Sequence, residues 1–390
     1  MTKRILSVLL MLAILTAMLS VTAFAADTVT INVYNWGQYI ADGTDDSLDV
    51  IEAFEEAYPN IKVNYMTFDS NESMYTKLKA GGSSFDIIIP SDYMIDKLIQ
   101  EDMLEELDFS NIPNYATIDE GFKNLAYDPE NRYSVPYTWG TVGIIYNTND
   151  VDPADVTGWE VFWNEKYSGK ILMFDNPRDA FAIAQLELGY DLNTEDSVAL
   201  GLSAQLLRDQ KPLVQAYVMD QIFDKMERAE AWIAPYYAGD YLTMVEENPD
   251  LAFYFPEEGY NLFVDAICIP KGAEHKKEAE TFINFLISPE ICAQNLEYLG
   301  YSAPSTAAKE LMDPEMAENP VAYPSGEVLA RGAAFRALSE TATQEMNTLW
   351  LTVKTADTAT TVYLILTLAA AVAVAVLWLY AKARRRAKKA

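Results

Sequence analysis

The chain has 390 residues, with 58 Asp and Glu against 28 Lys and Arg, and its formal net charge is −30 at pH 7. A protein with this much negative charge repels nucleic acid and anionic lipid and attracts cations. A nucleic-acid partner is therefore not expected. Two Cys exclude a disulfide scaffold, and a single His leaves little for histidine-based catalysis or metal binding.

Residues 1–25 have the pattern of a secretory signal peptide. A basic start at Lys3 and Arg4 precedes an apolar stretch, residues 5–19, and a small-residue cleavage signature ends at Ala25. We expect export of the chain and removal of this segment, with a retained N-terminal anchor as the alternative. Because no Cys stands at this junction, lipid attachment there is not expected.

After this segment, short apolar strands alternate with helices. The predicted strands cover residues 30–36, 61–68, 85–91, 142–147, 170–175, 231–235, 251–255 and 263–270. The predicted helices cover residues 45–59, 71–82, 92–104, 178–189 and 276–290, and Asp69 and Glu72 are expected to cap the second of them. Such alternation predicts an α/β fold with largely parallel sheets, and the length suits two domains.

The C-terminal end has the pattern of a membrane anchor. Residues 362–381 carry no charge, and as a helix they would span roughly 30 Å, one bilayer core. The tail, residues 382–390, carries six cations, which places it in the cytoplasm, and residues 353–361 would be the linker. A buried core helix is the alternative. Without the two ends, 20 basic residues face 58 acidic ones, a net charge of −38.

The sequence contains few residues or motifs that would support enzymatic catalysis. The single His, His275, stands at the start of a predicted helix without a nucleophile or a metal-ligand pattern near it, and the common glycine-rich nucleotide motifs are missing. We therefore expect no enzymatic activity, no cofactor and no metal, although paired carboxylates for glycoside hydrolysis stay open. Cys268 and Cys292 are expected to be buried thiols, with a disulfide as the alternative.

Aromatic and polar side chains gather where predicted strands end, and ligands of open α/β sheets bind at the carboxyl ends of strands. The candidates are Trp36, Gln38, Tyr39, Ser91, Tyr93, Asp175, Asn176, Asp179, Phe263 and Asp265, with Tyr301 after a predicted helix. Carboxylates hold ammonium groups by charge-assisted hydrogen bonds, and aromatic faces accept methylenes and positive charge. The set therefore predicts a site for an organic cation with apolar spacers.

Each candidate also has a purely structural explanation. Trp36 or Tyr93 alone would suit a packing role, and Asp179 would suit a cap of the helix that follows it. Asp265 is the sharpest case, because a carboxylate inside an apolar strand needs a cation or a hydrogen-bond partner. Arg178 would repel a cationic ligand, so we expect it to face away from the site and to pair with a neighbouring acid.

Several stretches together resemble a known family. The segments VYNWGQYI, SNESMYTKLKAGG, FDIIIPSDYMIDKLI, YSVPYTWGTVGIIYN, FVDAICIP and LGYSAPS stand in the order and spacing of the spermidine/putrescine-binding proteins of polyamine ABC transporters. The resemblance covers nearly all of residues 28–353. It implies a two-lobed periplasmic-binding-protein fold that closes over a polyamine in a cleft. Lobe 1 would comprise residues 26–135 and 254–305, and lobe 2 residues 136–253 and 306–352.

The implied function is an extracytoplasmic receptor that captures putrescine or spermidine and delivers it to an ABC permease. In that picture Tyr236 and Tyr237 join Asp179 on one lobe, and Asp265 grips an amine. The membrane helix would hold the binding domain outside the cytoplasmic membrane and beside its permease. A receptor for another small solute, either a cationic amine or a sugar, a carboxylate-based glycosidase and a surface adhesin are the alternatives.

The sequence departs from the family pattern at several site positions. Gln38 stands where some members carry Glu, Asn176 where some carry Asp, Phe263 where Trp is common, and Pro235 or Tyr236 where another Trp is expected. Phe335 falls about where a site Gln is expected. Fewer carboxylates neutralise fewer ammonium groups, so the number of amines recognised stays open.

Overall fold

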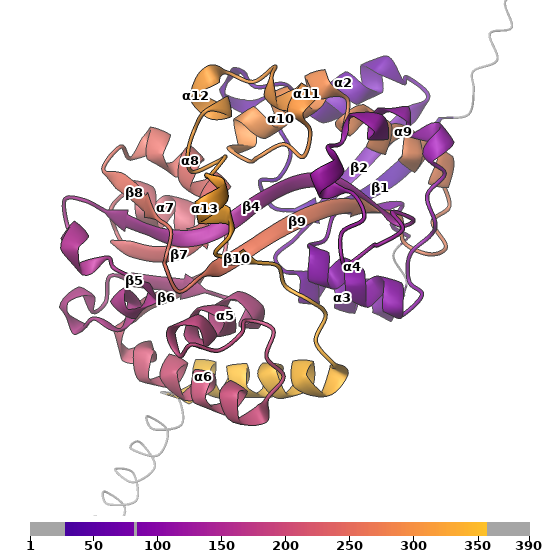
Figure 1. Cartoon of the computed structure of the whole chain (residues 1–390). Coiled ribbons are helices and arrows are strands. Elements are labelled where there is room, and N and C mark those ends of the chain that lie inside the picture. Colours follow the sequence, from indigo (N-terminus) through magenta and orange to yellow (C-terminus); the bar gives the residue numbers. More distant parts are fainter. Residues whose placement is uncertain (1–27, 82–83, 357–390) are drawn as a thin grey trace, which may run out of the picture.

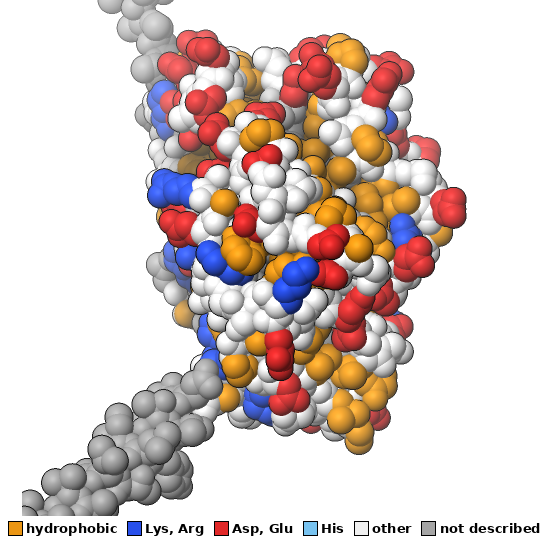
Figure 2. Space-filling view, turned by 90° about the vertical axis from the view of Figure 1, so that its left-hand side faces the viewer, with side chains coloured by type: hydrophobic (Ala, Val, Ile, Leu, Met, Phe, Trp, Pro, Cys, Tyr) orange, Lys and Arg blue, Asp and Glu red, His pale blue; other side chains and the backbone are white. Residues whose placement is uncertain are grey.

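The computed structural model describes residues 28–81 and 84–356 (Figure 1). The predicted signal peptide and the predicted membrane span, residues 362–381, lie outside these ranges. Within the described ranges, no helix is both long and apolar enough to cross a bilayer. Acidic side chains are spread over the face shown in Figure 2, most densely along its top, as the composition leads one to expect.

The strands form one mixed sheet in the order β2-β1-β3-β9-β4-β7-β5-β6, with β10 beside β9 and β8 beside β4. They are β1 (Val29–Trp36), β2 (Ile61–Phe68), β3 (Ile87–Ile88), β4 (Ser134–Asn147), β5 (Ile171–Phe174), β6 (Val214–Val218), β7 (Ile233–Tyr237), β8 (Leu251–Tyr254), β9 (Tyr260–Cys268) and β10 (Gly332–Ala333). Parallel pairs lie toward both ends of the sheet, but β4 and β9 pair antiparallel at its centre. The expectation of a largely parallel sheet is therefore wrong there, because these two long strands carry the chain across the molecule in opposite directions.

Helices cover the sheet on both sides (Figure 1). They are α2 (Val50–Ala57), α3 (Asn71–Ala80), α4 (Asp92–Gln100), α5 (Pro177–Glu187), α6 (Ser197–Gln210), α7 (Ile222–Glu227), α8 (Ala238–Glu247), α9 (Lys276–Leu286), α10 (Pro289–Leu299), α11 (Thr306–Lys309), α12 (Pro314–Ala317) and α13 (Gly326–Leu329), and residues 340–356 are also helical. The expected cap of α3 is wrong. Its N-cap is Ser70, whose hydroxyl accepts from the Ser73 amide at 3.1 Å in a capping box, because a short hydroxyl reaches the first-turn amides.

Two apolar cores divide the described chain into halves. The core of the first half includes Phe54 on α2, Ile87 on β3 and Phe282 on α9, and a smaller cluster around Met94 adjoins it. The core of the second half includes Phe174 on β5 and the helices around it. Free thiols of Cys268 and Cys292 are buried in the first half, as expected.

The chain passes between the halves along β4, along β9 and again between Tyr323 and Val328. The predicted lobe boundaries differ from the packing at two places. Ala308 and Met312, expected in lobe 2, are buried in the core of the first half, and Tyr260, expected in lobe 1, is buried in the core of the second. A sequence pattern shows that a residue is apolar but not which of two cores it enters.

The C-terminal helix, residues 340–356, packs beside α6 as the yellow helix of Figure 1. Trp350 and Val353 are buried in the core of the second half, and the Trp350 ring meets Tyr217 edge-on at 5.4 Å between centroids. Lys354 pairs with Asp175 at 2.5 Å. Residues 353–356 therefore belong to a docked helix and not to the predicted linker.

Candidate ligand-binding site

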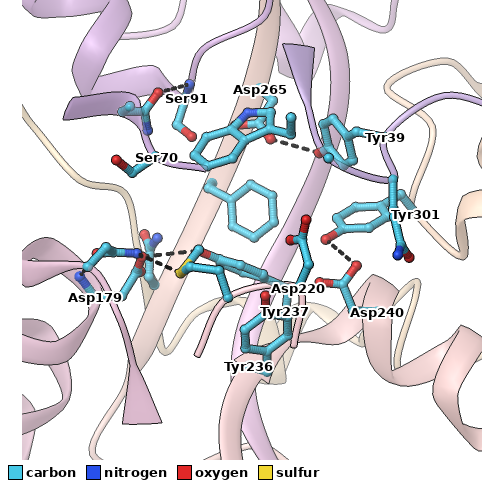
Figure 3. A pocket seen from close by; sticks show the side chains of 18 of the residues that line it. Tyr39, Ser70, Ser91, Asp179, Asp220, Tyr236, Tyr237, Asp240, Asp265 and Tyr301 are labelled. Carbon is cyan, nitrogen blue, oxygen red and sulfur yellow. Dashed lines mark hydrogen bonds between the residues drawn. The ribbon is translucent and has the colours of Figure 1, made fainter. Parts of the chain in front are cut away.

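A pocket lies between the two halves, around the strand ends, and contains about 740 Å³ of space that no atom fills, part of it open to solvent (Figure 3). All eleven residues of the predicted site line it, namely Trp36, Gln38, Tyr39, Ser91, Tyr93, Asn176, Asp179, Tyr236, Phe263, Asp265 and Tyr301. Tyr237 and Phe335 line it too. The candidate Asp175 does not, because its carboxylate is exposed and pairs with Lys354.

Asp265 stands on β9, directly opposite Thr138 of β4, and is 5% exposed. The Tyr39 hydroxyl donates to Asp265 Oδ2 at 2.7 Å and lies 2.5 Å from the Thr138 hydroxyl oxygen. Asp265 Oδ1 is buried without a hydrogen-bond partner. Burial raises the pKa of this carboxyl to about 6, against the opposing effects of the Tyr39 and Ser91 side chains. One carboxylate oxygen is thus left available to a donor that enters the pocket.

Asp179 lies at the start of α5, but it does not cap that helix. The cap is Asn176, whose side-chain oxygen accepts from the Asp179 amide at 2.8 Å. Asn176 Nδ2 donates back to Asp179 Oδ2 at 2.6 Å, and the Tyr237 hydroxyl donates to the same oxygen at 3.0 Å. Burial raises the Asp179 pKa, although these two hydrogen bonds oppose the shift. Asp179 is therefore held in place as a pocket carboxylate.

Aromatic rings fill the space between these carboxylates. Phe263 and Tyr237 meet edge-on with centroids 5.5 Å apart, and Tyr39 and Tyr301 meet edge-on at 5.0 Å. The rings of Trp36 and Phe68 pack with their centroids 4.6 Å apart, so Trp36 both lines the pocket and supports its wall. In Figure 3, Asp179 lies on the left of this aromatic group, and Asp240 with Tyr301 lies on the right.

The strand-end argument missed three further carboxylates that line the pocket, those of Glu72, Asp220 and Asp240. Glu72 on α3 accepts from the Tyr93 hydroxyl at 3.0 Å, and Asp240 on α8 accepts from the Tyr301 hydroxyl at 2.9 Å. Burial raises the pKa of Glu72, and it raises that of Asp240 to about 7 with help from the neighbouring negative charges of Asp220 and Asp265. Asp220 is an exposed rim residue.

Arg178 faces away from the pocket, as expected, but it does not pair with an acid. Its guanidinium donates to Asn193 Oδ1 at 2.7 Å and to the Arg336 carbonyl at 3.2 Å, and it lies over the Phe335 ring. Among the described residues that line the pocket there is no Lys, Arg or His. The pocket therefore has a negative lining with no cation in contact with its interior.

The two halves touch across the pocket. A Cβ atom on Gly37, in the first half, would lie 2.3 Å from Asp220 Oδ2 in the second half. A Cβ atom on Gly239 of α8 would lie 2.4 Å from the Tyr301 ring. A side chain at Gly239 would force the Tyr301 ring to shift, whereas the exposed Asp220 carboxylate could move aside for one at Gly37. Both approaches describe a closed arrangement of the halves.

A second group of carboxylates lies away from the pocket. Single oxygens of Glu160, Glu187 and Glu258 approach within 4.8 Å of one another, and two of the three side chains are exposed. Repulsion from the other two carboxylates adds to burial in raising the Glu187 pKa to about 7. Exposed carboxylates at such distances are common in acidic proteins, so this group does not by itself indicate a metal site.

Comparison with known proteins places this fold and pocket in a family. The family of bacterial extracellular solute-binding proteins matches residues 49–324. The spermidine/putrescine-binding periplasmic protein of Escherichia coli (strain K12) is 33% identical over 311 residues, which cover 80% of this chain and 87% of that protein. The putrescine-binding periplasmic protein SpuD of Pseudomonas aeruginosa (strain UCBPP-PA14) is 30% identical over 350 residues, covering 85% and 94%.

Comparison with solved structures leads to the same class of protein. The spermidine/putrescine ABC transporter substrate-binding protein PotD of Streptococcus pneumoniae, solved with calcium and HEPES, is 37% identical with a TM-score of 0.70, and the match covers 84% of this chain and 99% of that one. The PotD lipoprotein of Treponema pallidum is 29% identical with a TM-score of 0.72, covering 83% and 99%. The α/β solute-binding fold implied by the sequence is confirmed, and this chain belongs to the bacterial extracellular solute-binding protein family.

Proposed function

We propose that this chain is an extracytoplasmic receptor that captures a linear polyamine, putrescine or spermidine, and delivers it to an ABC permease. The observation that carries the proposal is the buried Asp265 Oδ1, which has no partner in a pocket lined by carboxylates and by no cationic side chain. A buried carboxylate without a counter-charge is costly, and an ammonium group supplies both the charge and the N–H donors that it lacks.

The shape of the charge distribution favours a long cation over a compact one. In Figure 3, Asp179 lies on the left of the pocket and Asp240 on the right, and Asp265 lies at the top, between them. Between them the rings of Phe263 and Tyr237 provide apolar faces that suit a methylene chain. A ligand with ammonium groups at both ends of an aliphatic chain satisfies both features. A neutral sugar would leave every one of these carboxylates without a counter-charge.

All eleven predicted site residues, together with Tyr237, which the resemblance also implies, are proposed as ligand contacts, and the pocket adds Glu72 and Asp240. In this proposal the carboxylates bind ammonium groups, and the rings of Trp36, Tyr39 and Phe263 contact methylenes. The names of the relatives, which describe spermidine/putrescine-binding and putrescine-binding proteins, support the same ligand class. The family's members are solute-binding proteins, and the proposal includes no catalytic step.

The topology is also a proposal. Residues 1–25 would direct export, residues 362–381 would anchor the receptor in the cytoplasmic membrane, and residues 382–390 would face the cytoplasm. Because the C-terminal helix is docked on the second half, that half would be the one attached to the anchor. Carbonate extraction of membranes from cells that make the full chain, compared with a chain that ends at residue 356, tests the anchor. Release of the full chain by carbonate would contradict it.

The ligand class is tested by calorimetry on the purified chain with putrescine, spermidine, glycine betaine and maltose. Binding of at least one polyamine with micromolar or tighter affinity, and none of maltose, is the expected result. Chromogenic glycosides are included because carboxylates face one another across the pocket. A response to maltose without a response to either polyamine, or turnover of a glycoside, would contradict the proposal.

A further inference from the structure

Some contacts between the two halves do not involve a ligand. Phe335 of the second half packs with Ala182 on α5, and its ring meets Tyr93 of the first half edge-on with the centroids 5.7 Å apart. Two residues further on, the Ala337 amide donates to Asp96 on α4 of the first half at 3.2 Å. Both contacts favour the closed arrangement whether or not the pocket is occupied.

Other contacts bring negative charges of the two halves together. The Tyr301 hydroxyl of the first half donates to Asp240 of the second at 2.9 Å, and the Tyr39 hydroxyl donates to Asp265 of the first half at 2.7 Å. The two tyrosine rings meet edge-on with their centroids 5.0 Å apart. Burial, with the negative charges of Asp220 and Asp265, raises the pKa of Asp240 to about 7. Closure therefore places Asp240 where it is both buried and repelled.

Asp220 adds a further negative charge from the second half. A Cβ atom on Gly37 of the first half would lie 2.3 Å from Asp220 Oδ2, so this carboxylate lies against the first half. Burial raises the pKa of Asp220, and the charge of Asp69, which follows β2 in the first half, adds to the shift. The pocket lining contains no Lys, Arg or His in the described part of the chain, so no lining side chain neutralises these acids.

The nearby guanidinium of Arg178 acts on other carboxyls. Burial raises the pKa of Glu72 and of Asp179, and the positive charge of Arg178 opposes the shift in both. The groups that shift the pKa of Asp240 include no cation. In Figure 3, Asp179 lies on the left of the pocket and Asp240 on the right. The repulsion at Asp240 is thus left for a ligand to relieve.

We infer that Asp240 makes closure of the two halves conditional on a cation in the pocket. The inference rests on the proposed function and adds how the charge of the ligand is coupled to closure. Without a cation, the repulsion of Asp240 by Asp220 and Asp265 offsets the favourable contacts at Phe335 and Ala337. An ammonium group near these carboxylates replaces the repulsion with attraction. A neutral solute does not, so Asp240 is a specificity-determining residue for charge.

A disulfide between the halves can report closure. Because Asp220 Cγ lies 3.3 Å from the Cβ position of Gly37, Cys residues at these two positions would have their Cβ atoms close enough for a disulfide in the closed arrangement. The chain's own thiols, Cys268 and Cys292, are buried, so they are shielded from the oxidant. The rate of cross-linking in the double variant Gly37→Cys/Asp220→Cys therefore follows the population of the closed arrangement.

The double variant is oxidised at pH 8 as the purified full chain in mild detergent, without ligand. Adding Asp240→Asn should speed cross-linking by about fivefold or more, because a repelled charge is removed. The matched control is Asp250→Asn, an exposed Asp of the same half that does not line the pocket, and its rate should stay within about twofold. Equal rates with and without Asp240→Asn would overturn the inference. The lack of a cross-link in every variant would also overturn it.

Ligands separate the inference from the proposed function. Putrescine should speed cross-linking of the double variant by about fivefold or more, and this acceleration should be at least about threefold smaller after Asp240→Asn. The neutral analogue 1,4-butanediol should have no effect, and acceleration by it would overturn the inference even if Asp240→Asn does not fold. If Asp240→Asn speeds cross-linking but no polyamine does, the inference stands and the proposed ligand class fails. Equal acceleration by putrescine with and without Asp240→Asn would overturn the inference and leave the proposed function standing.

Discussion

Gly239 and Tyr301 join the two halves of the molecule. A Cβ atom on Gly239 would lie 2.4 Å from two atoms of the Tyr301 ring, and the hydroxyl of that ring donates to Asp240, the next residue along α8, at 2.9 Å. The closed arrangement therefore depends on the lack of a side chain at one position in a helix of the second half.

Gly239→Ala is expected to hinder closure, because the Tyr301 ring would have to shift away from its packing against Tyr39 and its hydrogen bond to Asp240. The free energy of closure should become less favourable by about 1–3 kcal/mol, so polyamine affinity should fall by roughly five- to 150-fold. Calorimetry measures the affinity, and small-angle X-ray scattering with ligand should show a larger radius of gyration than the wild type. Gly201→Ala, on helix α6, is the matched control because its added Cβ would meet nothing within 4 Å. Equal effects of the two substitutions would contradict the role of Gly239.

Polyamine affinity is expected to depend on pH through the pocket carboxyls. Burial raises the pKa of Asp265 to about 6 and that of Asp240 to about 7. An ammonium ligand binds the ionised carboxylates, so affinity should fall as pH drops through 7 and 6, by on the order of tenfold between pH 8 and pH 6. Calorimetry at both pH values checks this, and Asp240→Asn should flatten the dependence. An affinity that rises toward pH 6 would contradict it.

The stability of the ligand-free chain should change with pH in the opposite sense. In the unfolded chain both carboxyls have a pKa of about 4, below their values in the folded protein, so the folded state binds more protons over the range between. Their contribution therefore lowers the free energy of unfolding as pH rises from about 4 to about 7. Urea denaturation at pH 5 and pH 8, with and without a saturating polyamine, measures this. The ligand should reduce the loss at pH 8.

The C-terminal helix is expected to be part of the fold of the second half. Trp350→Ala removes a buried ring that contacts Tyr217 and should lower the free energy of unfolding by about 3–5 kcal/mol. Leu351→Ala, at the next position, removes a side chain that is 63% exposed and should change it by less than about 0.5 kcal/mol. Similar small effects from both substitutions would show that the helix is not docked.

Local patterns explain how much of this molecule could be predicted. Strands such as Ile61–Phe68 were predicted with the boundaries that the structure has, because an apolar, β-branched run between turn residues carries its own signal. The strand-end rule, together with the family resemblance, brought residues as distant as Tyr39 and Asp265 into one predicted site. The structure joins them by a hydrogen bond of 2.7 Å.

The features that were missed depend on packing between distant segments. Glu72 was interpreted as part of a helix cap, but Ser70 caps α3, and Glu72 turns toward Tyr93 in the pocket. Asp240 lies only a few residues after a predicted strand, and extending the strand-end rule into the next helix would have found it. Only the family resemblance indicated a site position at Phe335, because its place in the pocket requires residues 334–339 to lie between α4 and Asn193.

The central claim is that Asp265 captures an ammonium group. It is tested most directly by calorimetric titration of putrescine into Asp265→Asn at pH 8, beside the wild type and the surface variant Glu310→Gln. Loss of a charge-assisted hydrogen bond should weaken putrescine binding by at least about tenfold, while the thermal midpoint of the ligand-free variant stays the same or rises because a buried charge is removed. Glu310→Gln should bind as the wild type does. An unchanged dissociation constant in Asp265→Asn would contradict the account.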